Sequence, residues 1–303
     1  MRTLNVNSLY WCLMHITTYL DDLVVWAPAK VNLFLEVLGK RPDGYHEIAT
    51  LMVAVRLYDT VIFRESAALT LQCSDTTLSA GPDNLVLRAA KLLQDRTGCR
   101  KGASIRLIKR IPMAAGLAGG STDAAATLLG LNRLWQLGLS ARDLAKLSSE
   151  IGSDIPFFFQ LPAAWCTGRG EIVNHVNLPI KLHFMLLCPA FGLATATVYK
   201  NVAVPPTAVS GDALRLALSK GDVDSIGRLM HNRLQLAAEK IEPRVGEFAR
   251  MLAECSPAGS LMSGSGSTMF ALCRSAADAE RIAASLKTRT KAHDFRMIVT
   301  RTI

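Results

Sequence analysis

A segment rich in glycine and alanine between residues 112 and 122 has the residue types that bind phosphate. It consists of Pro112, Met113, Ala114, Ala115, Gly116, Leu117, Ala118, Gly119, Gly120, Ser121 and Thr122. A polyphosphate needs several backbone N–H donors converging on it, and small side chains leave room for that approach. The segment joins an expected strand to an expected helix, whose first-turn amides and dipole would add to the attraction. Ser121 or Thr122 could cap that helix or turn a hydroxyl toward a phosphate or a magnesium ion. The alternative is a loop whose small residues only let the helix pack closely.

The spacing of this segment excludes two common nucleotide-binding patterns. No Gly-Lys-Ser/Thr follows a glycine at the Walker spacing, and the glycines do not form Gly-x-Gly-x-x-Gly. A dinucleotide site is therefore disfavoured.

A lysine and an asparagine share one face of the first convincing strand. The stretch Ala27-Pro28-Ala29-Lys30-Val31-Asn32-Leu33-Phe34-Leu35 alternates, so Lys30 and Asn32 point one way and Val31 and Leu33 the other. This pairing suggests a site, although an exposed strand face would give the same pattern.

Asp154 lies in Gly152-Ser153-Asp154-Ile155-Pro156, a break before three phenylalanines. An aspartate at such a position ordinarily caps a helix or stabilises a turn. A second glycine-rich stretch, Leu261–Thr268, could be a second phosphate loop or a simple hairpin turn.

The first glycine-rich segment resembles the phosphate loop of the GHMP kinases, the family of galactokinase, homoserine kinase and mevalonate kinase. The resemblance covers about residues 24–303. It implies an α+β fold with two lobes, an N-terminal lobe similar to a ribosomal-protein domain and a C-terminal ferredoxin-like lobe. It also implies that ATP, with Mg²⁺, is bound by residues 112–122.

Two further segments resemble one branch of this family, which phosphorylates a small-molecule cytidine diphosphate substrate derived from methylerythritol. They are Lys-Val-Asn-Leu-Phe-Leu from Lys30 and Arg-Pro-Asp-Gly-Tyr-His from Arg41. The resemblance implies that Tyr45, His46 and Tyr199 hold the cytidine, since bases stack on aromatic faces. Ordinary packing of the tyrosines is the alternative.

The same resemblance implies the catalytic roles. Asp154 would accept or orient the proton of the C2 hydroxyl, and Lys30 would keep Asp154 ionised and stabilise charge on the transferring group. Asn32 would orient this pair or the hydroxyl. Ala114, Ala115 and Ala118 replace glycines that are frequent in the family, so we expect no positive φ at these positions.

The periodicity of apolar residues and the turn residues predict a mixture of strands and helices without strict βαβ alternation. This pattern favours the α+β class. The expected strands cover residues 23–37, 48–55, 60–63, 104–108, 182–188, 295–303 and a hairpin within 261–273. The expected helices cover residues 85–95, 121–135, 143–150, 213–219, 222–239, 243–254 and 276–287. We expect an appendage over residues 1–22, an ATP-binding domain over 23–179 and a C-terminal domain over 180–303.

Composition narrows the function classes. A net charge of +9 suits an anionic partner, and the five cations between Arg100 and Arg110 indicate either a solvated strand face or a rim that attracts phosphates. Zinc-hydrolase and serine-esterase motifs are absent from the sequence. Seven scattered cysteines indicate reduced thiols, and residues 1–20 are too short and polar to span a membrane, so we expect a cytoplasmic protein.

Two other functions remain open. A homoserine or mevalonate kinase would share the loops but has no evident need for Gly44-Tyr45-His46. An RNA-binding module would suit the charge, but basic and aromatic residues are not interleaved and aromatics are only 6% of the chain. We therefore expect no nucleic-acid partner.

Overall fold

The computed structural model describes residues 14–289 and 295–303. The chain divides into two compact units. The first contains the described part of Met1–Ala29, together with Tyr58–Ile111 and Gly119–Leu161. The second contains Lys30–Leu57, Pro112–Ala118 and Pro162–Ile303. Their backbones combine helices with two sheets, which confirms the predicted α+β class. The predicted domain boundaries at residues 22 and 180 stay predictions.

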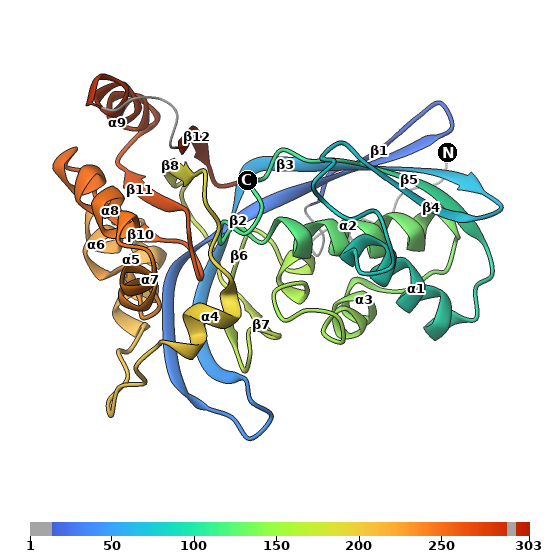
Figure 1. The fold of residues 1–303 in the computed structure, drawn as a ribbon, viewed down its shortest axis with the longest axis horizontal. Coiled ribbons are helices and arrows are strands. Elements are labelled where there is room, and N and C mark those ends of the chain that lie inside the picture. Colours follow the sequence, from blue (N-terminus) through green and yellow to red (C-terminus); the bar gives the residue numbers. More distant parts are fainter. Residues whose placement is uncertain (1–13, 290–294) are drawn as a thin grey trace. The chain divides into compact units, whose positions relative to one another are not determined.

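In the first unit, helices α1, α2 and α3 lie along one face of a group of strands (Figure 1). The strand order is β1-β2-β3-β5-β4, and β2 and β3 continue into the second unit. The elements are β1 (Ile16–Tyr19), β2 (Asp22–Lys40), β3 (His46–Ser66), β4 (Leu69–Cys73), α1 (Leu85–Thr97), β5 (Gly102–Ile108), α2 (Gly119–Leu134), α3 (Ala141–Ser148) and the 3₁₀ helix η2 (Pro156–Phe159).

Local signals explain how α1 begins and ends. The side chain of Asn84 accepts a hydrogen bond from the amide of Val86, which caps the first turn, and Gly98 ends the helix with a φ of 69°. The predicted turn at Gly81–Asn84 and the helix after it are confirmed. In the expected appendage, Ile16–Tyr19 pair antiparallel with Asp22–Val25 and add an edge strand to the sheet.

In the second unit, a four-stranded antiparallel sheet has the order β10-β11-β8-β12 and packs against α6, α8 and α9 (Figure 1). Its buried core includes Met185, Leu187, Leu252 and Ile282. The elements of this unit are β6 (Ala163–Thr167), β7 (Ile172–His175), β8 (His183–Pro189), α4 (Thr195–Lys200), α5 (Asp212–Lys220), α6 (Val223–Leu229), β9 (His231–Asn232), α7 (Gln235–Ile241), α8 (Arg244–Glu254), β10 (Gly259–Met262), β11 (Met269–Cys273), α9 (Ala276–Arg289) and β12 (Phe295–Arg301).

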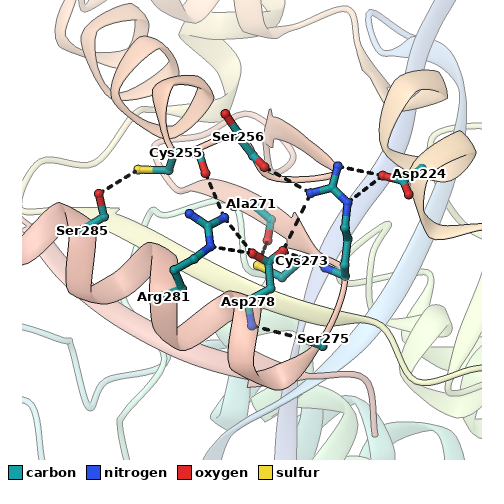
Figure 2. A network of polar contacts seen from close by, with 10 residues as sticks. Asp224, Cys255, Ser256, Ala271, Cys273, Ser275, Asp278, Arg281 and Ser285 are labelled. Atoms are coloured by element: carbon teal, nitrogen blue, oxygen red, sulfur yellow. Dashed lines mark hydrogen bonds and ion pairs between the residues drawn. The ribbon is translucent and has the colours of Figure 1, made fainter.

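Arg274 and Arg281 form hydrogen bonds and ion pairs that link the helices packed on this sheet (Figure 2). Arg281 donates to the carbonyl of Cys255 at 3.0 Å and Arg274 to that of Ser256 at 3.1 Å, so both satisfy carbonyls that follow α8. Asp278 binds both arginines, and Arg274 also pairs with Asp224 in the first turn of α6. The network joins α6, α8 and α9.

One predicted helix is wrong. The expected helix over residues 222–239 is two helices, α6 and α7, separated by the short strand β9. His231 and Asn232 pair parallel with Phe34 and Leu35 of β2, and this tertiary pairing overrides the local helix preference. The expected strands over 48–55 and 60–63 are parts of the single strand β3.

None of the helices in the described ranges is long and apolar enough to cross a bilayer. The six cysteines among the described residues are free, as the sequence predicts; Cys12 lies outside these residues.

Candidate active site

Residues 112–118 form a loop in the second unit whose backbone alternates in handedness. The φ angles are 49° at Ala114, 73° at Gly116 and 56° at Ala118. The expectation that the alanines avoid positive φ is therefore wrong for Ala114 and Ala118 and correct for Ala115. Each left-handed alanine costs about 1–2 kcal/mol, a strain that persists only where surrounding contacts enforce it.

The carbonyls of this loop supply those contacts. The carbonyl of Ala114 accepts from the amide of Leu193 at 3.3 Å, and that of Ala115 from the amide of Thr268 at 3.2 Å. The carbonyl of Leu117 accepts from the amide of Lys30 at 3.2 Å. Four successive carbonyls, including that of Gly116, are thus held by protein donors.

The amides of the same loop are not used in this way. Within the described part of the chain, none of the six N–H groups of residues 113–118 donates a hydrogen bond to protein. A backbone that alternates left- and right-handed conformations and has its carbonyls engaged elsewhere is the arrangement that binds anions through main-chain amides. The loop therefore fits a phosphate group.

The second glycine-rich stretch packs against this loop. It connects the antiparallel strands β10 and β11, so the hairpin interpretation holds. Ser263 also donates its Oγ hydrogen to the carbonyl of Gly116 at 2.9 Å. A Cβ on Gly116 would lie 2.0 Å from the carbonyl oxygen of Ser263, so the contact between the loops requires glycine.

Lys30 and Asn32 lie together beside the loops, as the strand period predicts. Lys30 Nζ is 2.6 Å from Asn32 Oδ1 and 2.7 Å from the carbonyl oxygen of Gly116. Both residues are only 3% exposed, so the alternative of a solvated strand face is wrong. Asn32 also donates to Thr50 Oγ1 at 2.8 Å, which fixes its amide.

Residues 119–122 belong to the first unit and begin α2. Ser121 is partly exposed, whereas Thr122 is buried and its Oγ1 has no hydrogen-bond partner among the described residues. Asp123 Oδ1, one residue further on, is buried and unpaired in the same sense. Hydroxyl oxygens such as those of Ser121 and Thr122 can bind Mg²⁺, so the start of α2 fits the ion.

Asp154, also in the first unit, is half-buried in a turn before η2. The three phenylalanines that follow are buried and anchor the segment. Ile155 is the N-cap residue of η2, and no side chain caps this helix, which removes the interpretation of Asp154 as its cap.

The three expected cytidine residues belong to the second unit, and two of them are in contact. The rings of His46 and Tyr199 have centroids 5.2 Å apart and planes 31° apart. Tyr45 is 54% exposed, and the guanidinium of Arg169 lies 4.7 Å from its ring centroid. Partial burial, with a contribution from Lys40, lowers the pKa of His46, so its ring is neutral at neutral pH.

A segment before α4 joins the two glycine-rich loops. In addition to the bond from Leu193 to Ala114, Ser267 donates to the carbonyl of Phe191 at 2.6 Å. The hydroxyls of Thr195 and Ser265 are 2.9 Å apart. Residues 191–195, which lead directly into the helix carrying Tyr199, are therefore bonded to both loops.

Sequence reasoning missed several residues of these surroundings. Lys109 was expected on a solvated strand face or a phosphate-attracting rim, but its side chain is 6% exposed and binds Asp59 and Asp123. Asn232 donates to the carbonyls of Met262 and Gly264 beside the second loop. The available signals were weak, since a lysine at the end of a strand and an asparagine inside a helical pattern have common structural roles.

Comparisons with known proteins agree with this geometry. Residues 84–160 match the GHMP kinases N terminal domain and residues 214–292 the GHMP kinases C terminal domain. The chain is 41% identical over 280 residues to a 4-diphosphocytidyl-2-C-methyl-D-erythritol kinase of Pelotomaculum thermopropionicum, covering 91% of this chain and 96% of the relative. It is 40% identical over 267 residues to the protein of that name from Brevibacillus brevis, covering 87% and 91%.

Solved structures give the same result for the fold. A crystal structure of 4-(cytidine 5'-diphospho)-2C-methyl-D-erythritol kinase superposes with a TM-score of 0.77 at 33% identity, covering 92% of this chain and 99% of the other. A homoserine kinase from Cytophaga hutchinsonii superposes with a TM-score of 0.74 at 19% identity, covering 96% and 97%. The second likeness concerns the fold alone.

Proposed function

The chain belongs to the GHMP kinases, and within them to the 4-diphosphocytidyl-2-C-methyl-D-erythritol kinases, and from this premise we propose its reaction. It transfers the γ-phosphoryl group of ATP to the C2 hydroxyl of 4-diphosphocytidyl-2-C-methyl-D-erythritol. The products are the 2-phosphate and ADP, a step of the non-mevalonate route to isoprenoids.

One observation within this chain carries the proposal. Among the described residues, the six amides of residues 113–118 donate to no protein group, while the four carbonyls of residues 114–117 accept from protein. This arrangement suits the oxygens of a triphosphate. Phosphoryl transfer depends chiefly on positioning and on neutralising charge, and a rigid ring of amides supplies both.

The roles of the side chains follow from their surroundings. The ammonium of Lys30, 2.7 Å from the Gly116 carbonyl, is held next to this loop and stabilises charge on the transferring group. Asp154 orients the acceptor hydroxyl and takes its proton. Asn32, fixed by Thr50, keeps the Lys30 ammonium in place.

Magnesium would be held at the start of α2 through Ser121 or Thr122. The ion would supply charge neutralisation for the phosphate groups. The cytidine would lie against Tyr45, His46 and Tyr199, since stacking on aromatic side chains is worth about 1–3 kcal/mol per base.

A coupled assay of ADP release tests the reaction. The protein is incubated with ATP and, in separate reactions, with the cytidylated methylerythritol, homoserine or mevalonate. We expect ADP and a new phosphate monoester only with the cytidylated alcohol. Turnover with homoserine or mevalonate instead would reject the assigned substrate.

Asp154→Ala tests the assigned base. We expect turnover to fall about 10²–10⁴-fold, the usual worth of general-base catalysis, while ATP binding measured by calorimetry is retained. Asp95→Ala is the matched control, because Asp95 is an exposed aspartate of the same unit that pairs with Lys91 on the surface of α1. Near-normal turnover of the Asp154 variant would contradict the assignment.

A further inference from the structure

Lys109 is the centre of a buried cluster of charged residues in the first unit. It follows β5, and its ammonium donates to Asp59 Oδ2 on β3 and to Asp123 Oδ2 on α2, the latter at 2.7 Å. The side chains are 6%, 0% and 3% exposed for Lys109, Asp59 and Asp123. The mechanism proposed above uses none of the three.

The cluster connects the two ends of the phosphate loop. Asp59 Oδ1 accepts the amide hydrogens of Arg110 and of Ile111, the latter at 2.9 Å, in the segment that enters the loop. Asp123 lies near the start of α2, just after its first turn, where the chain has left the loop. The carboxyl group of Asp59 on β3 therefore binds the backbone just before the loop directly, and through Lys109 it is connected to Asp123 just after the loop.

The close approach of the lysine depends on Gly119, the first residue of α2. A Cβ on Gly119 would lie 3.2 Å from Lys109 Nζ and 3.1 Å from Ile111 Cγ2. Both distances are tighter than ordinary contacts. The absence of a side chain at the first residue of α2 thus lets the ammonium sit against the helix start.

Stabilisation of the fold alone does not explain this cluster well. Three ionisable groups lose their water, and replacing such a buried cluster by apolar residues is often neutral or stabilising. Asp123 Oδ1 is buried and has no partner among the described residues, although fully satisfied networks are the stabilising ones. Unsatisfied buried groups of this kind point to a functional reason.

The charges of the cluster are unequal. Burial raises the pKa of Asp123 to about 8; Lys109 opposes this rise and Asp59 adds to it. Burial alone would lower the pKa of Lys109, but the two carboxylates outweigh it and raise this pKa. The lysine therefore remains charged at neutral pH.

We propose that Lys109, with Asp59 and Asp123, positions the two ends of the phosphate loop so that its amides are arranged for ATP before ATP binds. The inference rests on the proposed function, because it assigns these residues to the ATP-binding loop. The observed hydrogen bonds of their side chains are with one another and with the amides of Arg110 and Ile111, so we assign them as positioning residues. Pre-arranging a loop raises affinity because less ordering remains to be done on binding.

A change in the KM for ATP without a change in the KM for the alcohol distinguishes a positioning role from a general loss of stability. Lys109→Met, Asp59→Asn and Asp123→Asn are compared by the KM for ATP, the KM for the cytidylated alcohol, kcat and Tm. We expect the KM for ATP to rise about tenfold or more in Lys109→Met and Asp59→Asn, since small misplacements of a binding group have large effects. The KM for the alcohol should stay within about twofold.

The matched control is Leu93→Ala. Leu93 is a fully buried residue of α1 in the same unit, and its truncation costs stability without touching the ends of the loop. We expect it to lower Tm and leave both KM values unchanged. If Leu93→Ala raises the KM for ATP as much as Lys109→Met does, or if both substrates weaken equally in Lys109→Met, the positioning role is wrong.

Two further measurements keep the inference testable. If Lys109→Met does not fold, the isosteric Asp59→Asn decides, because it keeps the shape of the side chain but replaces one of the two acceptor oxygens by an amide group. An unchanged KM for ATP in a folded Asp59→Asn would then overturn the proposal. Calorimetric binding of ATP in the absence of any alcohol tests the cluster separately from the reaction. If the wild-type protein binds ATP but phosphorylates no cytidylated alcohol, the proposed function is refuted. The positioning role is then decided by the calorimetric affinities for ATP: equal affinities of the wild type and Lys109→Met would overturn it.

Discussion

Gly116→Ala is the substitution for which the structure gives the most definite expectation. The new methyl group would lie 2.0 Å from the carbonyl oxygen of Ser263, 3.0 Å from the carbonyl carbon of Ser263 and 3.1 Å from the amide nitrogen of Gly266. All three atoms are backbone, so no side chain can rotate away. The φ of 73° also disfavours any residue with a Cβ.

The size of the effect follows from these two terms. A left-handed conformation costs a residue with a Cβ about 1–2 kcal/mol, and overpacking a dense contact adds about 1–3 kcal/mol. The total is about 2–5 kcal/mol. The shift in Tm is roughly 2–4 °C per kcal/mol for 150–250 residues and smaller for longer chains, so at about 2 °C per kcal/mol Tm should fall by about 4–10 °C. Because the two loops must separate, the KM for ATP should rise as well.

Gly138→Ala is the matched control. Gly138 has a φ of 71°, but a Cβ there would meet nothing within 4 Å, so only the conformational cost of about 1–2 kcal/mol remains. Both variants are compared by thermal unfolding and by ATP kinetics. If they lose the same Tm and Gly116→Ala keeps its KM for ATP, the close contact between the loops does not exist as described.

Two further outcomes are expected. Burial would raise the pKa of Glu36, but the side chain of Arg233 and the amides of Val209 and Val37 lower it to about 2. Because the folded-state pKa lies below the ordinary 4.5, this group stabilises the fold above pH 4.5 and loses that contribution as the pH falls toward 2. Glu36→Gln should therefore reduce the decline of Tm over this pH range. An unchanged dependence of Tm on pH would refute the assignment. In α2, a Cβ on Gly130 would lie 2.4 Å from Cε2 of the buried Phe63, so Gly130→Ala should cost about 1–3 kcal/mol of unfolding free energy. Chemical denaturation measures this cost, and Phe63→Leu in the same chain should recover part of it; full additivity of the two changes would contradict direct contact.

The sequence predicted the elements whose patterns are local. The turn at Gly81–Asn84 contains its own cap, and the alternation around Lys30 and Asn32 is a property of one strand, so both are correct. The helix break at β9 was not predictable in this way, because it depends on pairing with β2, almost 200 residues earlier. Short strands such as β6, which contains two alanines, also lack a local signal.

The candidate site shows the same limit. The small residues of the phosphate loop were recognised from composition, but the positive φ of Ala114 and Ala118 is imposed by carbonyl partners from distant segments. The burial of Lys109 depends on carboxylates from two other elements, and no run of basic residues reveals it. The roles assigned to Lys30, Asp154 and the aromatic residues stay predictions until the variants are measured.

The bonds of residues 191–195 have a consequence for how the two ligands influence each other. This segment shares hydrogen bonds with both glycine-rich loops and continues into α4, so Tyr199 is attached to the same framework as the amides that we propose bind the triphosphate. A shift of either loop on nucleotide binding would therefore be transmitted to the ring beside His46. Thermodynamic linkage is reciprocal. If bound nucleotide changes the affinity for the cytidine base by some factor, bound cytidine must change the affinity for the nucleotide by the same factor.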